Sequence, residues 1–318
     1  MRAVRYHEHG GTDVLQVDEI DRPTPAGGDV LVDVAAAAIN PVDTYFREGS
    51  YEPATLPMIP GSDVAGTVAA VGEGVTAFEE GDRVFATGLG NDRQGTCAEY
   101  VAVPTDSLAR LPDSVDFRTG AASALVGVTA WQSLIAAGDL EPGARALVHG
   151  GSGGVGHMAV QLADATGARV TTTASPTYHD RLRDLGADDV FDYGRDDLAD
   201  AIAAAGQPDV VLDHRLDDYL SLDAEVAASG ATIAAIGNAD LQACFENVPR
   251  CRGKALTVEH VSMFNTPDMG AVLDRLAVLM ADGNLDAEIA HTYDLDGIAE
   301  AHRAVLEDSY FGKLVVEP

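Results

Sequence analysis

Lysine is nearly absent from this chain, because Lys254 and Lys313 are the two lysines among 318 residues. Acidic side chains number 51 and basic side chains 20, so the formal net charge at pH 7 is −31. Nucleic acids and anionic membranes are bound through basic patches. The composition therefore excludes both as expected partners.

Cysteine is also scarce, and the three cysteines, Cys97, Cys244 and Cys251, include no C-x-x-C pair. They are too few for a disulfide framework and lack the spacing of a zinc site, so we expect ordinary buried or half-buried thiols. We find no window of eighteen or more uncharged apolar residues and no apolar stretch behind the N-terminal MRAVRYHEHGG. A membrane span and a secretory signal are therefore not expected, and the expected location is the cytoplasm.

Aspartate dominates the acidic residues, with 35 Asp against 16 Glu. Together with the shortage of lysine, this pattern is typical of a halophilic protein. In about 1 M salt the Debye length is only about 3 Å, so repulsion between the carboxylates is mostly screened. A merely acidic protein from an ordinary environment is the alternative.

The charge predicts a strong dependence of folding on salt. We expect cooperative folding in molar KCl and progressive unfolding as salt is diluted, because screening of the −31 net charge is then lost. Thermal unfolding followed by circular dichroism from low to molar KCl measures this. A midpoint that stays flat across the series would contradict the halophilic interpretation.

The length exceeds the usual size of one hydrophobic core, so two domains are expected. Residues 1–120 contain short β-like runs separated by Gly and Pro, which predict a β-barrel-like domain. Residues 121–264 alternate strand-like runs, such as ARALVHG, ARVTTTAS, DDVFDY, DVVLDH and ATIAAIG, with helical patterns. This alternation predicts a doubly wound parallel sheet and hence an α/β protein. Residues 265–318 are helical and end in the strand-like LVVEP, which we expect to return to the first domain.

A glycine-rich run, VHGGSGGVG, spans Val148 to Gly156 and has the spacing G-x-G-x-x-G at Gly151, Gly153 and Gly156. An apolar strand precedes it, and an apolar helical face follows until Gly167. Glycines let the backbone approach a pyrophosphate, and a helix N-terminus supplies free N–H groups and a positive dipole end. The run therefore predicts a dinucleotide site.

The strand after this loop favours NADPH over NADH. NAD enzymes hold the ribose hydroxyl with an acidic residue at the end of that strand. Here ARVTTTAS ends in Ala174 and Ser175, with no carboxylate to repel a 2′-phosphate. Nearby groups that can donate to a phosphate are Ser175, His179, Arg181, Arg183 and Tyr193, although helix periodicity also places the arginines on a solvated face.

Nearly the whole chain resembles the zinc-free quinone oxidoreductases related to zeta-crystallin, within the medium-chain dehydrogenases/reductases. The resemblance rests on AAAAINPVDTYFREGSY, LPMIPGSDVAGTVAAVGEGVTAFEEGDRVF, ASALVGVTAWQSL, VHGGSGGVG, LGADDVFDY and GKLVVEP, in the order of the family. It implies a GroES-like first domain, a Rossmann domain and an active site in the cleft between them. Relatives are commonly homodimers or homotetramers, which is the expectation here by analogy.

The resemblance also implies site residues. It places Asn40, Tyr45 and Tyr51 near the nicotinamide and the substrate, as the catalytic group. Cofactor contacts are implied for Thr129, Ser152, Gly153, Gly154, Val155, Ser175, Tyr193, Ile236, Gly237, Asn238, Val261, Ser262 and Met263, to which the glycine spacing adds Gly151 and Gly156 and the end of the next strand adds His179. The chain departs from the family where His179 stands in place of a common lysine, and where relatives often read VVLDxVGG but this chain reads VVLDHRLDD.

No metal is expected. Zinc-dependent members of the superfamily carry Cys near Ile39 and Asn40, and Gly-His-Glu where this chain has Gly61, Ser62 and Asp63. Zinc needs three or four N, S or carboxylate ligands in one place, and the nine histidines lack such spacing.

Without a metal, the expected chemistry is hydride transfer from NADPH to an acceptor that already stabilises negative charge, such as a quinone. Tyr51 and Asn40 would then donate hydrogen bonds to the developing oxyanion. A reductase of α,β-unsaturated ketones or enoyl thioesters is the alternative. A non-catalytic, crystallin-like NADPH-binding protein is a further one.

Overall fold

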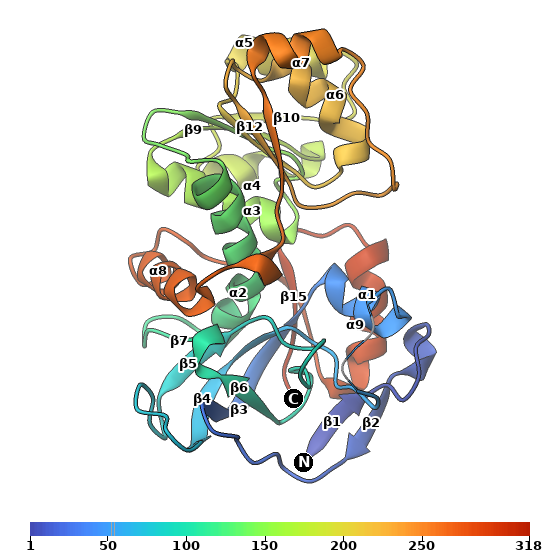
Figure 1. Cartoon of the computed structure of the whole chain (residues 1–318), viewed down its shortest axis with the longest axis vertical. Helices are drawn as coiled ribbons and strands as arrows, with labels where there is room; N and C mark the ends of the chain where they lie inside the picture. The colour runs from blue at the N-terminus through green and yellow to red at the C-terminus, as the bar shows by residue number, and fades with distance from the viewer. Residues whose placement is uncertain (52, 54) are drawn as a thin grey trace. The chain divides into compact units, whose positions relative to one another are not determined.

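The computed structural model describes residues 1–51, 53 and 55–318. It divides into two compact units (Figure 1), unit 1 with Met1–Leu125 and Pro267–Pro318, and unit 2 with Val126–Thr266. The first division falls inside α2 (Phe117–Trp131), a helix that the sequence analysis did not anticipate. The predicted α/β class, with a β-rich unit and a parallel-sheet unit, is confirmed.

Unit 2 is built on a six-stranded sheet in the order β10-β9-β8-β11-β12-β13. Every neighbouring pair is parallel. The strands are β8 (Arg145–Val148), β9 (Arg169–Thr173), β10 (Asp189–Phe191), β11 (Val210–Asp213), β12 (Thr232–Ala235) and β13 (Thr257–His260). The first five were predicted, whereas β13 was not, because TVEH has two charged or titratable side chains and little apolar content.

Helices cover this sheet, as its parallel order requires. They are α3 (Gly154–Thr166), α4 (His179–Asp184), α5 (Leu198–Ala205), α6 (Leu216–Val226) and α7 (Val248–Lys254). Helix α3 packs on β8 and β9, and α6 packs on β11. Leu147, Val211 and Ile233 are fully buried among them, so adjacent strands contribute the core. The π-helical turn Gln132–Ala137 follows α2.

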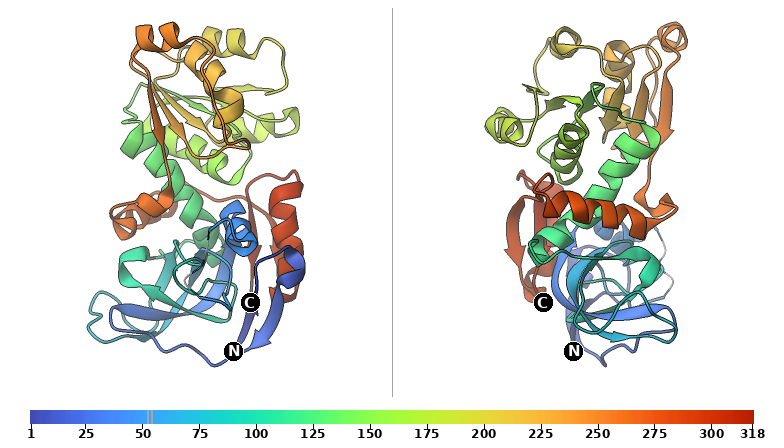
Figure 2. Two further views of the ribbon diagram at one scale, coloured as in Figure 1. Left: turned by 45° about the vertical axis from the view of Figure 1, so that its right-hand side comes forward. Right: turned by 90° about the vertical axis from the view of Figure 1, so that its left-hand side faces the viewer.

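Unit 1 is built on a seven-stranded sheet in the order β14-β15-β3-β4-β5-β7, with β6 paired to β3. Its strands are β3 (Asp29–Ile39), β4 (Asp63–Val71), β5 (Arg83–Ala86), β6 (Tyr100–Pro104), β7 (Leu108–Arg110), β14 (Ile289–Tyr293) and β15 (Lys313–Val316). A hairpin-like pair, β1 (Arg2–Arg5) and β2 (Gln16–Glu19), is separate. Figure 2 shows the C-terminal strand β15 within unit 1, where it pairs antiparallel with β3.

Three helices complete unit 1: α1 (Pro41–Glu48), α8 (Met269–Ala281) and α9 (Ile298–Glu307). Ile298 and Ala301 of α9 lie in one buried cluster with Ile39 and Leu314. The helix therefore holds the end of β3 and the start of β15 together, which matters for the site described below.

The expectation for the cysteines needs correction, whereas the expectation that no membrane span is present is not overturned. The helical stretch Phe117–Ala137 is long and apolar enough to cross a membrane by length and composition, although 72% of its most apolar window is buried within the structure. A mostly buried helix in the core of a protein that does not span a membrane meets the same criteria of length and composition. Cys244 is exposed, Cys251 is half-buried and Cys97 is buried, so the expectation of buried or half-buried thiols is wrong for Cys244.

Candidate functional site

The strand order of unit 2 creates a switch point between β8 and β11. From β8 the chain proceeds outward to β9 and β10, and from β11 it proceeds in the other direction to β12 and β13. In open α/β sheets, ligands bind outside the carboxyl ends of the strands at such a point. The predicted glycine loop leaves β8 at this position.

The glycine loop turns directly into α3. Gly153 is the N-cap of this helix, and among the described residues no side chain hydrogen-bonds to the cap. The Gly151 N–H is bonded to the Thr173 carbonyl (2.9 Å) and the Gly153 N–H to the Gly150 carbonyl (3.0 Å). An uncapped first turn leaves backbone N–H groups for an anion. Gly154, Val155 and Gly156 belong to that turn.

Gly151 and Gly156 of the loop have no room for a side chain. A Cβ on Gly156 would lie 2.1 Å from the Gly150 carbonyl oxygen, and a Cβ on Gly151 would lie 2.2 Å from Thr172 Oγ1. A Cβ on Gly153 would meet its nearest atom at 3.4 Å, an ordinary contact. Close backbone packing at Gly151 and Gly156, with free space at Gly153, fits the cradle that a dinucleotide pyrophosphate requires.

Of the residues predicted to hold a 2′-phosphate, Ser175 and Tyr193 lie next to each other, whereas His179 and Arg183 bind other groups. Ser175 follows β9 and Tyr193 follows β10, and the Ser175 hydroxyl donates to the Tyr193 phenol oxygen at 3.3 Å. Tyr193 is 54% exposed. His179 Nε2, in contrast, lies 3.1 Å from the Ala174 carbonyl oxygen, so this ring nitrogen is already engaged by the backbone. Arg183 is paired with Asp180 on the same helix.

Six further predicted cofactor residues lie where other strands end. Ile236, Gly237 and Asn238 follow β12, and Val261, Ser262 and Met263 follow β13. Thr129 is buried in α2, where its carbonyl accepts the Ser133 hydroxyl (2.8 Å). Because all strands of this sheet are parallel, the loops after β8, β9, β12 and β13 share one edge. Most predicted cofactor residues therefore lie at one edge of unit 2.

Helix α1 of unit 1 carries the predicted tyrosines. Tyr45 is 41% exposed, and Tyr51, just past the Gly49 C-cap, is 57% exposed. The Tyr51 ring packs edge-on against Phe46, with centroids 5.8 Å apart. Partial burial, assisted by Glu48, raises the pKa of Tyr45 above its ordinary value. The Tyr45 phenol is thus a neutral donor at physiological pH.

Asn40 differs from the tyrosines because it is 1% exposed. Its Nδ2 donates to Asp63 Oδ2 (2.8 Å), and its Oδ1 accepts a hydrogen bond from Lys313 Nζ. Its backbone N–H donates to Asp43 Oδ2 (2.8 Å) at the start of α1. The amide is thus held inside the protein, and this geometry supports a positioning role for Asn40 rather than direct donation to a substrate.

Lys313 is the centre of this buried network and was missed as a functional residue. Its Nζ donates to the Ile39 carbonyl (2.9 Å) and lies 3.9 Å from Asp63 Oδ2. Burial lowers the pKa of Lys313, whereas Asp63 and Asp43 oppose that shift. The available signal was that one of just two lysines begins an apolar strand.

The positions that hold zinc in the metal-dependent relatives do not fit a metal ion. Asn40 and Asp63 are bonded to each other, and the Lys313 ammonium lies against both. A fixed cation there repels a divalent ion. In the part of the chain that the structure describes, no group of three His, Cys, Asp or Glu side chains is placed to hold a metal.

Asp43 makes the stability of the folded protein depend on pH. It is fully buried, accepts the Ser62 hydroxyl at 2.7 Å, and burial raises its pKa to about 7. A carboxyl with a higher pKa in the folded than in the unfolded state takes up protons on folding. The stability that Asp43 contributes is fully present below its pKa in the unfolded state, about 4. It is lost as pH rises through its pKa in the folded state.

We therefore expect Asp43→Asn to have a flatter dependence of unfolding free energy on pH. The difference between pH 5 and pH 8 should shrink by at least about 1.4 kcal/mol, the equivalent of one pKa unit. Denaturant unfolding of both proteins in molar KCl measures this. Groups that do not contact Asp43 titrate equally in both proteins and cancel. Parallel curves would mean that Asp43 is ionised throughout.

A second buried polar cluster lies beneath the glycine loop and was not predicted. It contains His149, which precedes the loop, Asp213 at the end of β11, and Asp223 of α6, all 1% exposed or less. His149 Nε2 lies 2.8 Å from Asp223 Oδ1. The stretch VVLDHRLDD, which departs from the family pattern, had indicated this region. Nothing in its spacing showed that Asp223 would contact His149.

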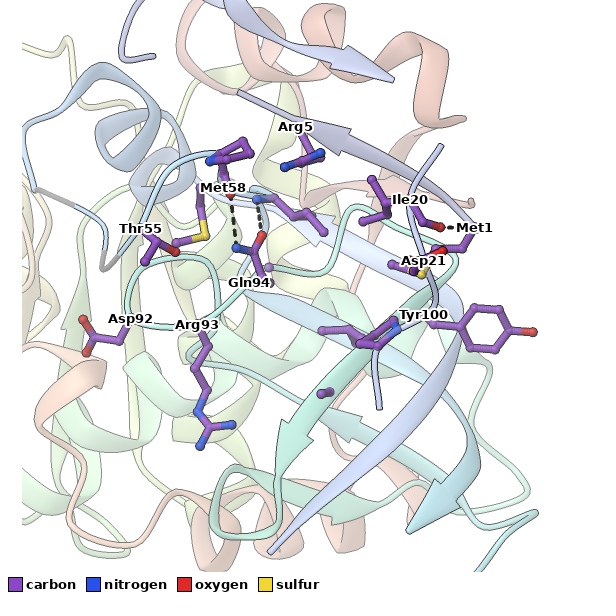
Figure 3. Close-up of a pocket in the computed structure, with 16 residues that line it drawn as sticks. Met1, Arg5, Ile20, Asp21, Thr55, Met58, Asp92, Arg93, Gln94 and Tyr100 are labelled. Atoms are coloured by element: carbon purple, nitrogen blue, oxygen red, sulfur yellow. Dashed lines mark hydrogen bonds between the residues drawn. The ribbon is translucent and has the colours of Figure 1, made fainter. Parts of the chain in front are cut away.

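Unit 1 also contains a pocket of about 520 Å³ (Figure 3). Gln94 closes one side by accepting the Ile59 N–H (2.8 Å) and donating to the Pro57 carbonyl (3.2 Å). Its cations are neutralised, because Arg5 pairs with Asp18 and Arg93 with Asp29. The predicted catalytic residues do not line this pocket, and it has no part in the site proposed below.

Comparisons with known proteins agree with this geometry. The pattern of the alcohol dehydrogenase GroES-like domain matches residues 26–113, and that of the zinc-binding dehydrogenases matches residues 185–316. The quinone oxidoreductase of Homo sapiens is 33% identical over 326 residues, which cover 99% of this chain and 97% of the human protein. The chain belongs to the quinone oxidoreductase family. It is an oxidoreductase of the medium-chain dehydrogenase/reductase type.

Solved structures in the family match the complete chain. Escherichia coli quinone oxidoreductase complexed with NADPH has a TM-score of 0.89 at 28% identity, with 100% of both chains covered. An NAD-dependent alcohol dehydrogenase has a TM-score of 0.91 at 30% identity, also over 100% of both chains. The family fold is therefore shared by proteins described with different nicotinamide cofactors and substrates.

Proposed function

We propose that this oxidoreductase uses NADPH to reduce a quinone or a similar conjugated carbonyl, without a metal. The observation that carries the proposal is the glycine loop at the switch point of unit 2, which opens α3 without a side-chain cap. Gly151 and Gly156 there have no room for a Cβ, as expected for a backbone cradle.

The choice of NADPH is supported by the end of β9. Ser175 and Tyr193 lie within hydrogen-bonding distance of each other, and the loop position that an NAD enzyme fills with a carboxylate is occupied by Ala174 and Ser175. In a chain of net charge −31, long-range attraction cannot select a phosphate. Selection must come from short hydrogen bonds, which these two hydroxyls are able to donate.

The choice of acceptor is supported by what unit 1 offers. The Lys313 ammonium stands among the residues at the zinc positions, so a metal is not available there to polarise an alcohol or aldehyde. Quinones and enones stabilise the incoming negative charge themselves. Tyr51 and Tyr45 are the exposed donors of the predicted catalytic group.

The chemistry follows from these roles. Bound NADPH supplies a hydride from C4 of its nicotinamide. Backbone N–H groups at the start of α3 hold the pyrophosphate, and a tyrosine phenol donates to the oxygen of the acceptor as negative charge develops. One proton from solvent then completes a two-electron reduction to the hydroquinone.

A panel assay tests this proposal directly. NADPH oxidation in molar KCl is measured with quinones, enones and enoyl thioesters, and the highest kcat/KM is expected for quinones. A highest value for enones or enoyl thioesters would support the alternative reductase instead. No oxidation with any acceptor, but tight NADPH binding, would support a non-catalytic binding protein.

We expect kcat/KM to be at least about tenfold higher with NADPH than with NADH, which needs about 1.4 kcal/mol of differential binding. Tyr193→Phe and Ser175→Ala should each reduce the NADPH value and leave the NADH value unchanged, because NADH has no 2′-phosphate. NADH thus serves as the internal control. Equal efficiency of the native protein with both cofactors would contradict the assignment.

A further inference from the structure

The buried cluster beneath the glycine loop joins the loop to β9 and to α6. Thr173, the last residue of β9, accepts the Gly150 N–H with its hydroxyl at 3.2 Å. The same hydroxyl lies 3.2 Å from His149 Nδ1. On its other side, His149 Nε2 contacts Asp223 at 2.8 Å. A continuous path of hydrogen bonds therefore runs from an amide of the loop to a carboxyl of α6.

The rings around this path leave little freedom of movement. The His149 ring is stacked on Tyr219, with centroids 4.2 Å apart and planes 3° from parallel. A Cβ on Gly150, which has a φ of +68°, would lie 2.7 Å from the His214 ring. The first residue of the loop is therefore packed directly on His214, and the residue before it is held by Tyr219.

Two carboxyl groups meet at the far end of the path. Asp213 Oδ1 accepts the Arg215 N–H at 2.7 Å, and Asp223 Oδ1 is occupied by His149. The second oxygen of each carboxyl is buried and has no donor within the described part of the chain. Helix α6, which carries Asp223, packs on β11, which ends at Asp213, and the two carboxyls interact strongly enough that each affects the pKa of the other. Two buried carboxylates so close cannot both be ionised, and one proton between them would satisfy both open oxygens.

We propose that Asp213 and Asp223 share one proton, and that this acid–carboxylate pair, through His149 and Thr173, positions the first amide of the glycine loop for the cofactor pyrophosphate. Asp213 and Asp223 are thus positioning residues, because neither is placed to touch the ligand itself. The second part of the proposal rests on the proposed use of a dinucleotide.

The charges around the pair are consistent with this arrangement. Burial raises the pKa of both Asp213 and Asp223 above the ordinary value of a carboxyl. Burial also lowers the pKa of His149 and of His214 to about 4, so both rings are neutral at physiological pH. Among the other facing groups, Arg215 is paired with Asp218, and burial raises the pKa of the Tyr219 phenol. Among the described residues, no neighbouring cation therefore replaces the shared proton.

These charges determine whether cofactor affinity rises or falls with pH. At neutral pH the pair carries one negative charge, and loss of the shared proton at higher pH adds a second. Two ionised carboxylates repel each other, which strains the path to Gly150, and the added charge also opposes an anionic ligand at the loop. Cofactor affinity should therefore decrease as pH rises above neutrality.

Asp213→Asn removes the titratable proton but keeps a hydrogen bond between the two side chains. The asparagine Oδ1 keeps the Arg215 contact, and its Nδ2 donates permanently to Asp223, as the protonated acid would. We expect NADPH affinity at pH 7, measured by cofactor fluorescence in molar KCl, to stay within about threefold of the native protein. Between pH 7 and pH 9 the native dissociation constant should rise by roughly threefold to tenfold, whereas that of Asp213→Asn should stay flat. The same rise in both proteins would overturn the proposal.

Infrared spectroscopy of the cofactor-free protein tests the pair independently of the proposed function. Native protein at pH 7 should show a carboxylic acid C=O band that is lost in both Asp213→Asn and Asp223→Asn. Asp43→Asn is the matched control, because Asp43 is a buried acid of raised pKa outside the pair and its removal must leave the pair's band in place. An unchanged acid band in Asp213→Asn would overturn the shared proton. If the band is lost in Asp213→Asn and Asp223→Asn but the native protein binds no NADPH, the shared proton stands and only the proposed cofactor is contradicted.

Discussion

Replacing Gly156 by alanine is expected to weaken NADPH binding by at least about 100-fold, which corresponds to about 2.7 kcal/mol. The new Cβ would lie 2.1 Å from the Gly150 carbonyl oxygen and 2.8 Å from Gly151 Cα. These atoms belong to the backbone of the same loop, so no flexible side chain is able to move aside. The loop must change shape, and the amides at the start of α3 then no longer converge on one anion.

Two other alanine variants make this result specific. Gly253→Ala places a Cβ in open space on α7 and should leave affinity and stability unchanged. Gly153→Ala fits the loop itself, with its nearest contact at 3.4 Å, so it should leave the unfolding free energy unchanged but still obstruct a pyrophosphate close to the backbone. Titration of cofactor fluorescence and denaturant unfolding measure the two quantities. Normal NADPH binding by both loop variants would show that the loop does not hold the pyrophosphate.

Tyr51→Phe is the second substitution with a large expected effect, a decrease in kcat of about 100-fold with an enone acceptor. Tyr51 is 57% exposed, and its phenolic hydroxyl is able to donate a hydrogen bond. Removing the hydroxyl removes the donor to the developing oxyanion. The decrease should be smaller for quinones, because the reduced quinone is already well stabilised.

NADPH affinity separates this role from a structural one. Phenylalanine keeps the edge-on contact with Phe46, so the dissociation constant of NADPH should stay within a few-fold of normal. Tyr100→Phe, at the pocket of Figure 3, is a control that should affect neither quantity. If Tyr51→Phe weakens NADPH binding and leaves kcat unchanged, Tyr51 packs against the cofactor and is not the donor.

The position of Asn40 narrows the choice of donor. Sequence analysis gave Asn40 and Tyr51 the same role, because both lie in one short stretch of the chain. In the structure the Asn40 amide is held by Asp63 and Lys313, whereas the Tyr51 phenol is exposed. We therefore assign the proposed donation to Tyr51 and the positioning of α1 to Asn40.

The sequence by itself determined the features that are encoded locally. Alternating apolar strands and amphipathic helices gave the parallel sheet of unit 2, and the glycine spacing after an apolar strand gave the loop that opens α3. These features depend on neighbouring residues, through backbone conformation and the period of apolar side chains. The short strand β13 lacked such a period and was missed.

Only the tertiary structure decided which distant polar groups share a buried site. Lys313 reaches Asn40 across 273 positions, and His149 reaches Asp223 across 74. No local pattern encodes such contacts, because strand order and helix packing bring these residues together after the chain has folded. Burial then changes their chemistry, raising the pKa of Asp43 to about 7 and lowering that of His149 to about 4. Desolvation, which depends on everything packed around a group, is the physical reason that the sequence did not reveal these roles.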